Sequence, residues 1–422
     1  MVNQKRNNFK NIFSDICINI IATILPVFLL QFIVLPLMAN KCTNTEYGLI
    51  LTLISMITLS VQSLSVSLTN TRLLMNQRYI EADLKGDFNL ILFISSIGNI
   101  IFVSIGTYLY EGSFNTINVF FIIILSTIQL IRKYLEVSFR LDISYKKILW
   151  SNFLLGIGYL VGWIFFIYTD IWQLVYIAGE VISLIYIIRK SHLLKEPLKI
   201  THLFKDTVRQ SSILLIASFL GTTITYIDRL LLYPILGPRM VTVYYVATLL
   251  GKTMSMVVTP INNVILTYLS KMTGFKKDSF KVIFSLSIFM GFCSYIGILL
   301  ISKPVLNIMY PEYVHDAMKI IYITTLMAIF NMLSTIINPI LMKFCDISWQ
   351  MWINVINIVI YISLSIFLVN LFGIYGFCIG SLVASGVKLA FMILIYARIS
   401  RKSRQCNNSL KVAKINKSHQ HT

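Results

Sequence analysis

The sequence predicts an all-α polytopic membrane protein with twelve transmembrane helices in two six-helix bundles. Three observations predict this fold class: the composition, the run of apolar segments and the distribution of basic residues. Apolar residues make up 57% of the 422-residue chain and charged residues only 13%. That charged fraction is about half of the roughly 25% that is usual in soluble proteins. Long apolar runs separated by short basic loops are typical of helical membrane proteins.

Twelve apolar segments follow one another along the chain. Most of them reach the ~20 residues that a helix needs to cross a bilayer. The first is too long for the core of a signal peptide, so we expect a retained transmembrane helix. The fifth and sixth are nearly fused at Thr169 and Asp170, which predicts a short turn. The predicted segments are 16–39, 47–68, 88–110, 115–135, 148–168, 171–188, 211–233, 241–269, 282–301, 317–340, 351–371 and 375–397.

Basic residues fix the predicted orientation of these helices. With the N-terminus in the cytoplasm, 29 of the 36 Lys and Arg residues fall in inner regions of the chain. Cytoplasmic loops of membrane proteins carry such an excess of basic residues, so we expect both termini in the cytoplasm. The other seven are Lys41, Arg239, Lys303 and Lys319 in outer regions, and Arg229, Lys252 and Lys388 inside apolar segments.

The net charge of +19 follows from this distribution. It fits the topology of the chain together with an attraction to the anionic head groups of membrane lipids. Nucleic acid is not an expected partner, because the charge is spread over the inner loops and does not gather on one soluble face.

The longest inner connection separates six segments from six. Within it Leu203, Phe204 and Val208 fall on one helical face, which favours a short amphipathic helix from about Thr201. A plain basic loop is the alternative. The predicted parts of the chain are an N-terminal six-helix bundle (1–190), a cytoplasmic linker (191–210), a C-terminal six-helix bundle (211–397) and a basic cytoplasmic tail (398–422).

An internal repeat agrees with this division. Two stretches match at a constant offset of 198 residues, and each joins the first and second helices of its half. Because a half with an even number of helices repeats in the same orientation, the repeat is parallel, around an axis along the membrane normal. Two such bundles facing each other leave a cleft, which is a transporter architecture. The matched pairs are Pro36 and Pro234, Lys41 and Arg239, Tyr47 and Tyr245, Leu51 and Leu249, and Met56 and Met254.

No motif in the sequence predicts an enzyme. The stretch LLGKT at 249–253 resembles the end of a P-loop, but Val246 stands where the first glycine of that motif belongs, and the stretch lies in an apolar segment. The six cysteines, at positions 17, 42, 293, 345, 378 and 406, have neither a C-x-x-C nor a metal-binding spacing. We therefore expect no ATP hydrolysis, no disulfide framework and no metal site.

Three stretches carry a family resemblance: YIDRLLLYPILGPRMVTVYYVATLLGK at 226–252, NTEYGLI at 44–50 and YPEYVHDA at 310–317. They are similar to the patterns of Wzx-type polysaccharide flippases, which belong to the superfamily of multidrug, oligosaccharidyl-lipid and polysaccharide (MOP) exporters with a MATE-like fold. The twelve-helix plan extends the resemblance to the whole chain, whereas the motifs say almost nothing about the substrate.

The resemblance implies a function. Such a flippase exports an undecaprenyl-pyrophosphate-linked oligosaccharide from the inner to the outer leaflet of the bacterial plasma membrane by alternating access. Its product is used for a surface polysaccharide, such as the O-antigen of lipopolysaccharide or a capsule, so the polysaccharide polymerase machinery is an expected partner. No cofactor is expected, and coupling to a proton or sodium gradient stays open.

Ionisable residues inside the apolar segments are the candidate translocation residues, because a charge in a bilayer is costly. Lys252 lies ~17 Å and Lys388 ~20 Å along its predicted helix at ~1.5 Å per residue. Glu180 lies near the middle of its segment. Cationic side chains suit a pyrophosphate. A structural ion pair between helices, for example of Glu180 with a lysine, is the alternative.

Two further pairs stand at the ends of segments. Arg72 and Arg132 mark the inner ends of the second and fourth, where they either signal topology or line an inner mouth that receives the pyrophosphate. Asp228 and Arg229 are neighbours on one helix and cannot satisfy each other well, so each needs another partner. We expect them to form a structural lock at the outer end of the second bundle, with a gate as the alternative.

Three other functions compete with a flippase. A drug antiporter of the same superfamily is expected to carry a coupling acid inside the first bundle. Asp15 lies only at the mouth of the first segment, which leaves Glu180 as the main deep acid there; this shortage of deep acids mildly disfavours an antiporter. A polysaccharide polymerase or ligase resembles a different plan, with a large outer loop, and the longest one here, 302–316, is too short. A non-transporting scaffold does not explain lysines near the middle of the membrane.

Overall fold

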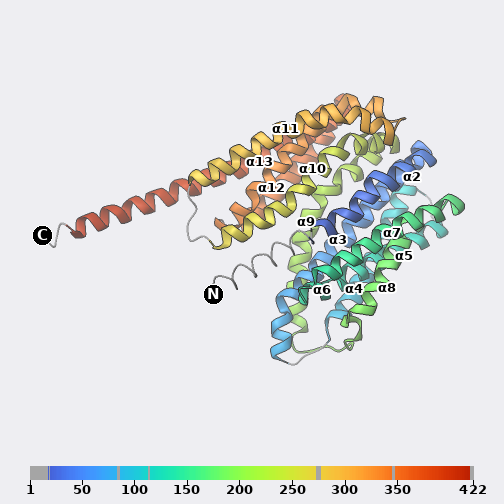
Figure 1. Cartoon of the computed structure of the whole chain (residues 1–422), viewed down its shortest axis with the longest axis horizontal. Coiled ribbons are helices and arrows are strands. Elements are labelled where there is room, and N and C mark those ends of the chain that lie inside the picture. The colour runs from blue at the N-terminus through green and yellow to red at the C-terminus, as the bar shows by residue number, and fades with distance from the viewer. Residues whose placement is uncertain are drawn as a thin grey trace. The chain divides into compact units, whose positions relative to one another are not determined.

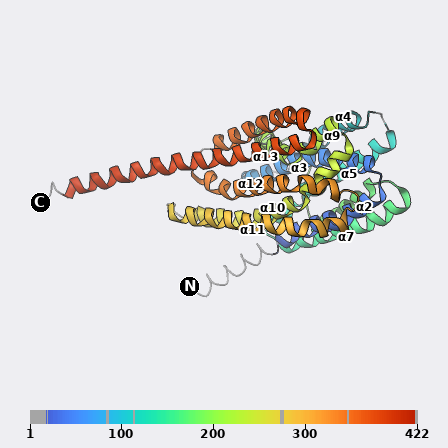
Figure 2. The same ribbon diagram turned by 90° about the horizontal axis from the view of Figure 1, so that it is seen from above.

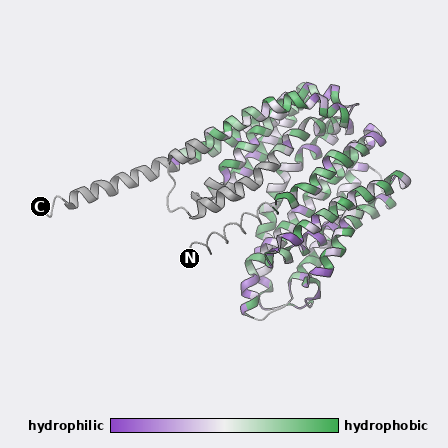
Figure 3. Cartoon of the chain, viewed as in Figure 1, coloured by the Kyte–Doolittle hydropathy of each residue, from purple (hydrophilic) through white to green (hydrophobic). Residues whose placement is uncertain are grey.

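The computed structural model in Figure 1 describes residues 18, 20–82, 86–112, 115–271, 277–344 and 347–418 of the chain. Every regular element among these residues is a helix. Figure 3 shows that apolar residues cover much of the length of the coloured helices. The all-α membrane fold class predicted from the sequence is therefore confirmed.

The helices follow the predicted segments and extend beyond many of their ends. Nine described helices are long and apolar enough to cross a membrane. The predicted segments 171–188 and 241–269 also form helices, but these are not among the nine. The predicted segments 351–371 and 375–397 are joined at Gly373 into one helix. The count of twelve transmembrane helices therefore stays a prediction. The elements are η1 (Leu30–Val34), α2 (Leu35–Lys41), α3 (Asn44–Glu81), α4 (Phe88–Glu111), α5 (Thr116–Leu135), α6 (Val137–Leu141), α7 (Tyr145–Thr169), α8 (Gln173–Lys190), η2 (Leu193–Lys195), α9 (Phe204–Leu236), α10 (Pro238–Lys271), α11 (Lys277–Met309), α12 (Val314–Phe344) and α13 (Ile347–Ser418).

The described chain divides into two compact units. The first holds the described residues up to Tyr245 together with Ile308–Pro311, and the second holds Val246–Asn307 and the described chain from Glu312 onward. In the first unit α9 packs along α3, and α8 packs along both α7 and α5. In the second unit α12 packs against α13, as Figure 2 shows from above. The four parts expected from the sequence stay a prediction.

Serines bring α3 and α9 together. The hydroxyl of Ser67 donates to the backbone oxygen of Ser211 at 2.6 Å, and the hydroxyl of Ser218 donates to the backbone oxygen of Ser63 at 2.8 Å. Small polar residues let membrane helices approach closely, so α9 lies in the first unit although its segment begins the predicted C-terminal bundle. The amphipathic stretch of the linker is not a separate helix, because α9 runs from Phe204 without a break.

The short turn predicted between the fifth and sixth segments is present. Asp170 ends α7 with a left-handed φ of 59°, and its carboxylate lies 2.6 Å from the Nζ of Lys41. The same Nζ donates to the backbone oxygens of Phe166 and Ile167 at 2.9 and 2.8 Å. The last carbonyls of a helix have no partner within the helix, so Lys41 caps α7.

Glycines set the contact between α7 and α8. A Cβ atom at Gly158 would overlap the backbone of Gly179, and one at Gly162 would overlap the backbone of Val175. Membrane helices associate through such small residues because lipid gives no hydrophobic drive for their packing. The contact fixes the helical turn that carries Glu180, the residue after Gly179.

Candidate functional site

A buried ion pair joins α5 and α8 in the first unit. The Nε of Arg132 donates to the Oε2 of Glu180, and the two residues are only 4% and 1% exposed. The Nη1 of Arg132 also lies 3.5 Å from the Oε2 of Glu136. Glu180 therefore has an arginine partner where the sequence suggested a lysine, and one guanidinium serves two carboxylates.

Lys133 extends this group toward α3. Its Nζ donates to the Oε1 of Gln62 at 2.7 Å. We call Gln62, Arg132, Lys133, Glu136 and Glu180 the α5 polar cluster; it holds two basic and two acidic groups. Buried charges are costly unless they are paired. The balance of charge therefore suits a role in holding α3, α5 and α8 together.

Arg72 holds the linker against the first unit. Its Nη1 and Nη2 donate to the two carboxylate oxygens of Glu196 at 2.7 and 2.5 Å, and its guanidinium carbon lies 4.3 Å from the ring centre of Phe88. Beside this pair, a carboxylate oxygen of Asp87 accepts a hydrogen bond from the backbone N–H of Thr201 at 2.8 Å. The linker is therefore fastened to the turn between α3 and α4.

Both arginines expected at an inner mouth thus have carboxylate partners. A pyrophosphate that bound Arg72 or Arg132 would have to displace a carboxylate from a charge-assisted, partly buried contact. Neither partner was foreseen from the sequence, because Glu196 lies in a loop and Glu180 lies on another helix.

Asp228 and Arg229 of α9 have different partners. The Oδ1 of Asp228, which is 5% exposed, accepts a hydrogen bond from the backbone N–H of Arg229 at 2.8 Å. The side chain of Arg229 reaches α3 instead, where its Nη1 donates to the hydroxyl of Ser55 at 3.0 Å. Its guanidinium carbon lies 4.7 Å from the ring centre of Tyr245. Arg229 therefore ties α9 to α3 and to the start of α10.

Tyr245 belongs to a buried cluster of three tyrosines in the first unit. The ring centre of Tyr310 lies 6.3 Å from that of Tyr245 and 6.5 Å from that of Tyr47. The hydroxyls of Tyr47 and Tyr310 are 3.5 Å apart. Tyr47 and Tyr245 are a matched pair of the internal repeat, so both halves of the chain contribute the same residue to one cluster.

Replacing Arg229 with alanine is expected to destabilise the first unit by about 2 kcal/mol, because it removes a charge-assisted hydrogen bond and a cation–π contact. Arg229→Lys keeps the charge but loses the planar guanidinium, so we expect about half of that effect. Thermal unfolding of the detergent-solubilised protein measures both variants. Ser55→Ala, which removes only the hydroxyl, is the control; equal unfolding midpoints for Arg229→Ala and Ser55→Ala would contradict the role of the Tyr245 contact.

In the second unit, tight packing positions Lys252 on α10. Lys252 itself is half-buried. A Cβ atom at the preceding Gly251 would lie 2.8 Å from the Cβ of Ala328 on α12. One turn earlier, the hydroxyl of Thr324 donates to the backbone oxygen of Ala247 at 3.1 Å. The turn that carries Lys252 is therefore fixed against α12.

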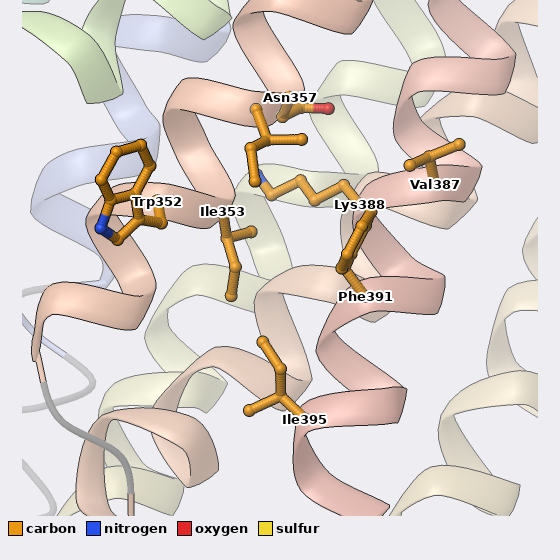
Figure 4. A pocket seen from close by; sticks show the side chains of 8 residues that line it. Trp352, Ile353, Asn357, Val387, Lys388, Phe391 and Ile395 are labelled. Carbon is orange, nitrogen blue, oxygen red and sulfur yellow. The ribbon is translucent and has the colours of Figure 1, made fainter.

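Lys388 lies in a groove between the two arms of α13 that meet at Gly373. Its side chain extends from the second arm toward the first, which carries Asn357 (Figure 4). Asn357 is 5% exposed, and its Oδ1 has no hydrogen-bond partner within the described part of the chain. The groove encloses a space of about 40 Å³ and is lined by Trp352, Ile353, Ile356, Asn357, Val387, Lys388, Phe391 and Ile395.

Sequence reasoning singled out Lys388 but missed Asn357. The available signal was an asparagine inside an apolar segment. Among the described residues there is no group of three or more His, Cys, Asp or Glu side chains that could hold a metal ion.

Comparison with known proteins adds to this picture. No protein-family model matches the chain, and no curated protein matches it in sequence. Among solved structures, it is similar to an inward-facing multidrug resistance MATE family transporter of the MOP superfamily, with 12% identity over 91% of this chain and 99% of that chain and a TM-score of 0.65. It is equally similar to the lipid II flippase MurJ, with 13% identity, 91% and 86% coverage and a TM-score of 0.65.

A Vibrio cholerae MATE transporter, VcmN, is also similar, with 13% identity over 92% of this chain and 95% of that chain and a TM-score of 0.55. These similarities show that the chain has the fold shared by MATE transporters and MurJ. The MATE-like fold expected from the sequence is therefore confirmed.

Proposed function

We propose that the protein is a Wzx-type flippase, which moves an undecaprenyl-pyrophosphate-linked oligosaccharide from the inner to the outer leaflet of the bacterial plasma membrane. The observation that carries the proposal is the fold, which the chain shares over 91% of its length with a multidrug MATE transporter and with the lipid II flippase MurJ. The fold alone does not distinguish a drug transporter from a lipid flippase. We therefore use the charges of the chain to decide between these two functions.

The charges of the second unit favour an anionic substrate. Its two deep ionisable residues are both basic, Lys252 and Lys388. Its four acidic residues lie outside the apolar segments predicted from the sequence, namely Asp278, Glu312, Asp316 and Asp346. Lysine binds phosphate as a point charge. The apolar segments of this unit therefore contain no carboxylate that could bind a cationic drug. They do contain two lysines that could bind a pyrophosphate.

A MATE-like antiporter for drugs or other cations is the second candidate, favoured by the deep acid Glu180. Arg132 neutralises that carboxylate, which weakens this reading. A membrane polysaccharide polymerase or ligase has less support still. The outer stretch at 302–316 is mostly helical, with α11 ending at Met309 and α12 beginning at Val314, so no room is left for a reactive loop.

The proposed flippase lies in the plasma membrane with both termini in the cytoplasm. Its product serves the synthesis of a surface polysaccharide, and it works beside the polysaccharide polymerase machinery. A proton or sodium gradient is the proposed source of energy, since the sequence has no ATP-binding motif.

Deleting the gene in its own cell is expected to remove the surface polysaccharide and to accumulate its lipid-linked precursor. The wild-type chain should restore both. Lys252→Ala should restore less than a tenth of the surface glycan at a normal membrane protein level, because the deep positive charge is lost, and Lys252→Arg should restore more. Surface glycan and protein level are measured together.

Lys319→Met is the matched control for that experiment. Lys319 is exposed and pairs with Asp316 at 3.0 Å near the start of α12, so its loss should leave export unchanged. Normal surface glycan in the deletion strain would refute the proposed function, and normal export by Lys252→Ala would refute the role of that lysine.

A further inference from the structure

The groove between the arms of α13 holds a cation that has no acidic counterpart nearby in the sequence. From Ile347 to Ser418 the chain contains no Asp or Glu. The four acids of the second unit lie outside its predicted apolar segments, as described above. An ionised lysine in an apolar setting is stable only with a counter-charge. None of the second unit's predicted apolar segments contains an acid that could supply this counter-charge. An anionic ligand bound in the groove would supply it.

A second polar group faces the same groove. Asn357 is buried to 95%, and its carbonyl oxygen has no hydrogen-bond partner among the described residues. Buried polar atoms normally have partners. Its amide can donate to an anion, and its oxygen can accept from a hydroxyl or from the lysine. Lys388 and Asn357 are thus the two polar side chains with hydrogen-bonding groups, besides the indole of Trp352, that line a mostly apolar groove.

Depth decides which anion fits. Asn357 lies six residues after Met351, where the eleventh predicted segment begins, and Lys388 lies nine residues before Ala397, where the twelfth ends. At ~1.5 Å per residue they are ~9 Å and ~14 Å from the inner ends of these segments, so Lys388 lies near the middle of the ~30 Å hydrocarbon core. The phosphate of a resident phospholipid stays in the head-group region. A phosphate at Lys388 therefore belongs to a lipid whose head group is crossing the membrane.

The remaining lining suits the chain of such a lipid. Trp352, Ile356 and Phe391 are exposed at the side of the groove, whereas Ile353 is buried within it. The enclosed space of the groove is about 40 Å³, a few times the ~10–15 Å³ that one water molecule needs. It therefore accepts a small group such as a phosphate, but not an oligosaccharide, and the chain of the lipid would lie along the exposed side.

We infer that the groove between the two arms of α13 is a mid-membrane binding site for the phosphate of a transported long-chain lipid. Lys388 and Asn357 contact the phosphate, and Trp352, Ile356 and Phe391 contact the chain. The inference rests on the proposed function. It adds to that function a binding site for the lipid phosphate in the second unit.

Equilibrium binding of undecaprenyl phosphate to the full-length protein in lipid nanodiscs tests this site. We expect Lys388→Met to raise the Kd about 10- to 100-fold, since one charge-assisted contact is lost. Lys388→Arg should stay within about threefold of wild type, because it keeps the charge. Asn357→Leu should raise the Kd by about three- to tenfold through loss of a single neutral hydrogen-bonding group. Lys303→Met removes an exposed lysine of the same unit and should change nothing.

Two competitors identify the source of the phosphate. Undecaprenol has the chain without the phosphate, and phosphatidylglycerol has the phosphate of a resident lipid; both should compete at least about tenfold more weakly than undecaprenyl phosphate. An unchanged Kd for both Lys388→Met and Asn357→Leu overturns the site. Equal competition by undecaprenol shows a purely apolar groove, and equal competition by phosphatidylglycerol shows a site for resident lipid; either result also overturns the inference.

The binding test separates this inference from the proposed function. If the deletion strain keeps its surface glycan while the purified protein binds undecaprenyl phosphate through Lys388, the proposed function fails and the site stands. If the deletion strain loses its glycan while Lys388→Met binds as wild type does, the function stands and the site fails.

Discussion

Arg132→Met should be among the most damaging single substitutions in the first unit. It leaves the carboxylate of Glu180 buried at 1% exposure without its cation. Breaking a buried ion pair from one side costs on the order of 3–5 kcal/mol in soluble interiors, and often less in membranes. We therefore expect a large drop in the yield of folded protein and in its thermal unfolding midpoint in detergent.

A double variant and an exposed pair make this result specific. Arg132→Met combined with Glu180→Leu removes both charges, so it should recover much of the stability lost by Arg132→Met. Lys319→Met breaks the exposed pair with Asp316 and should cost only ~0.5 kcal/mol. A double variant that is less stable than Arg132→Met would show that the pair is not what holds α5 against α8.

Gly158→Ala is expected to have the second-largest effect. A single methyl group there would overlap the backbone of Gly179, so α7 and α8 would have to move apart. Overpacking of this kind costs about 1–3 kcal/mol, and the upper end applies because the obstacle is backbone and not a flexible side chain. The unfolding midpoint and the monodisperse fraction of the purified protein should both fall.

Gly98→Ala is the matched control, since Gly98 lies in the apolar helix α4 and a Cβ atom there would meet nothing within 4 Å. The same substitution should be neutral or stabilise by up to ~1 kcal/mol, because alanine favours the helix. Opposite signs for the two variants are the expected outcome. Similar losses at both positions would mean that helix propensity, and not the contact between α7 and α8, determines the effect.

The sequence predicts the helices well because hydropathy is a property of one segment at a time. The turn at Asp170 was predicted because two apolar segments leave almost no residues between them. The packing of α9 along α3 was not predicted, since the serines that allow it, such as Ser67 and Ser218, look like ordinary polar residues within an apolar run. Contacts between distant segments do not appear in a hydropathy profile.

Candidate residues show the same limit. Glu180 was selected as a charge that is costly in a membrane and Arg132 as a basic residue at the inner end of a segment, but they are 48 residues apart, and nothing in the sequence pairs them. Lys388 was selected by depth, whereas the position of Asn357 in the same groove became visible only once the two arms of α13 were side by side. The equivalent positions of Tyr47 and Tyr245 in the repeat could be predicted from the sequence, but their shared contact with Tyr310 could not.

The central claim is that the protein carries a lipid-linked anion across a membrane. The most direct test places the purified full-length protein in liposomes with a fluorescent undecaprenyl-pyrophosphate-linked oligosaccharide and measures how fast the glycan becomes accessible on the opposite leaflet. We predict protein-dependent movement that Lys252→Ala abolishes and Lys319→Met leaves intact. Movement no faster than in protein-free liposomes, together with export of a cationic drug by the same preparation, would contradict the claim.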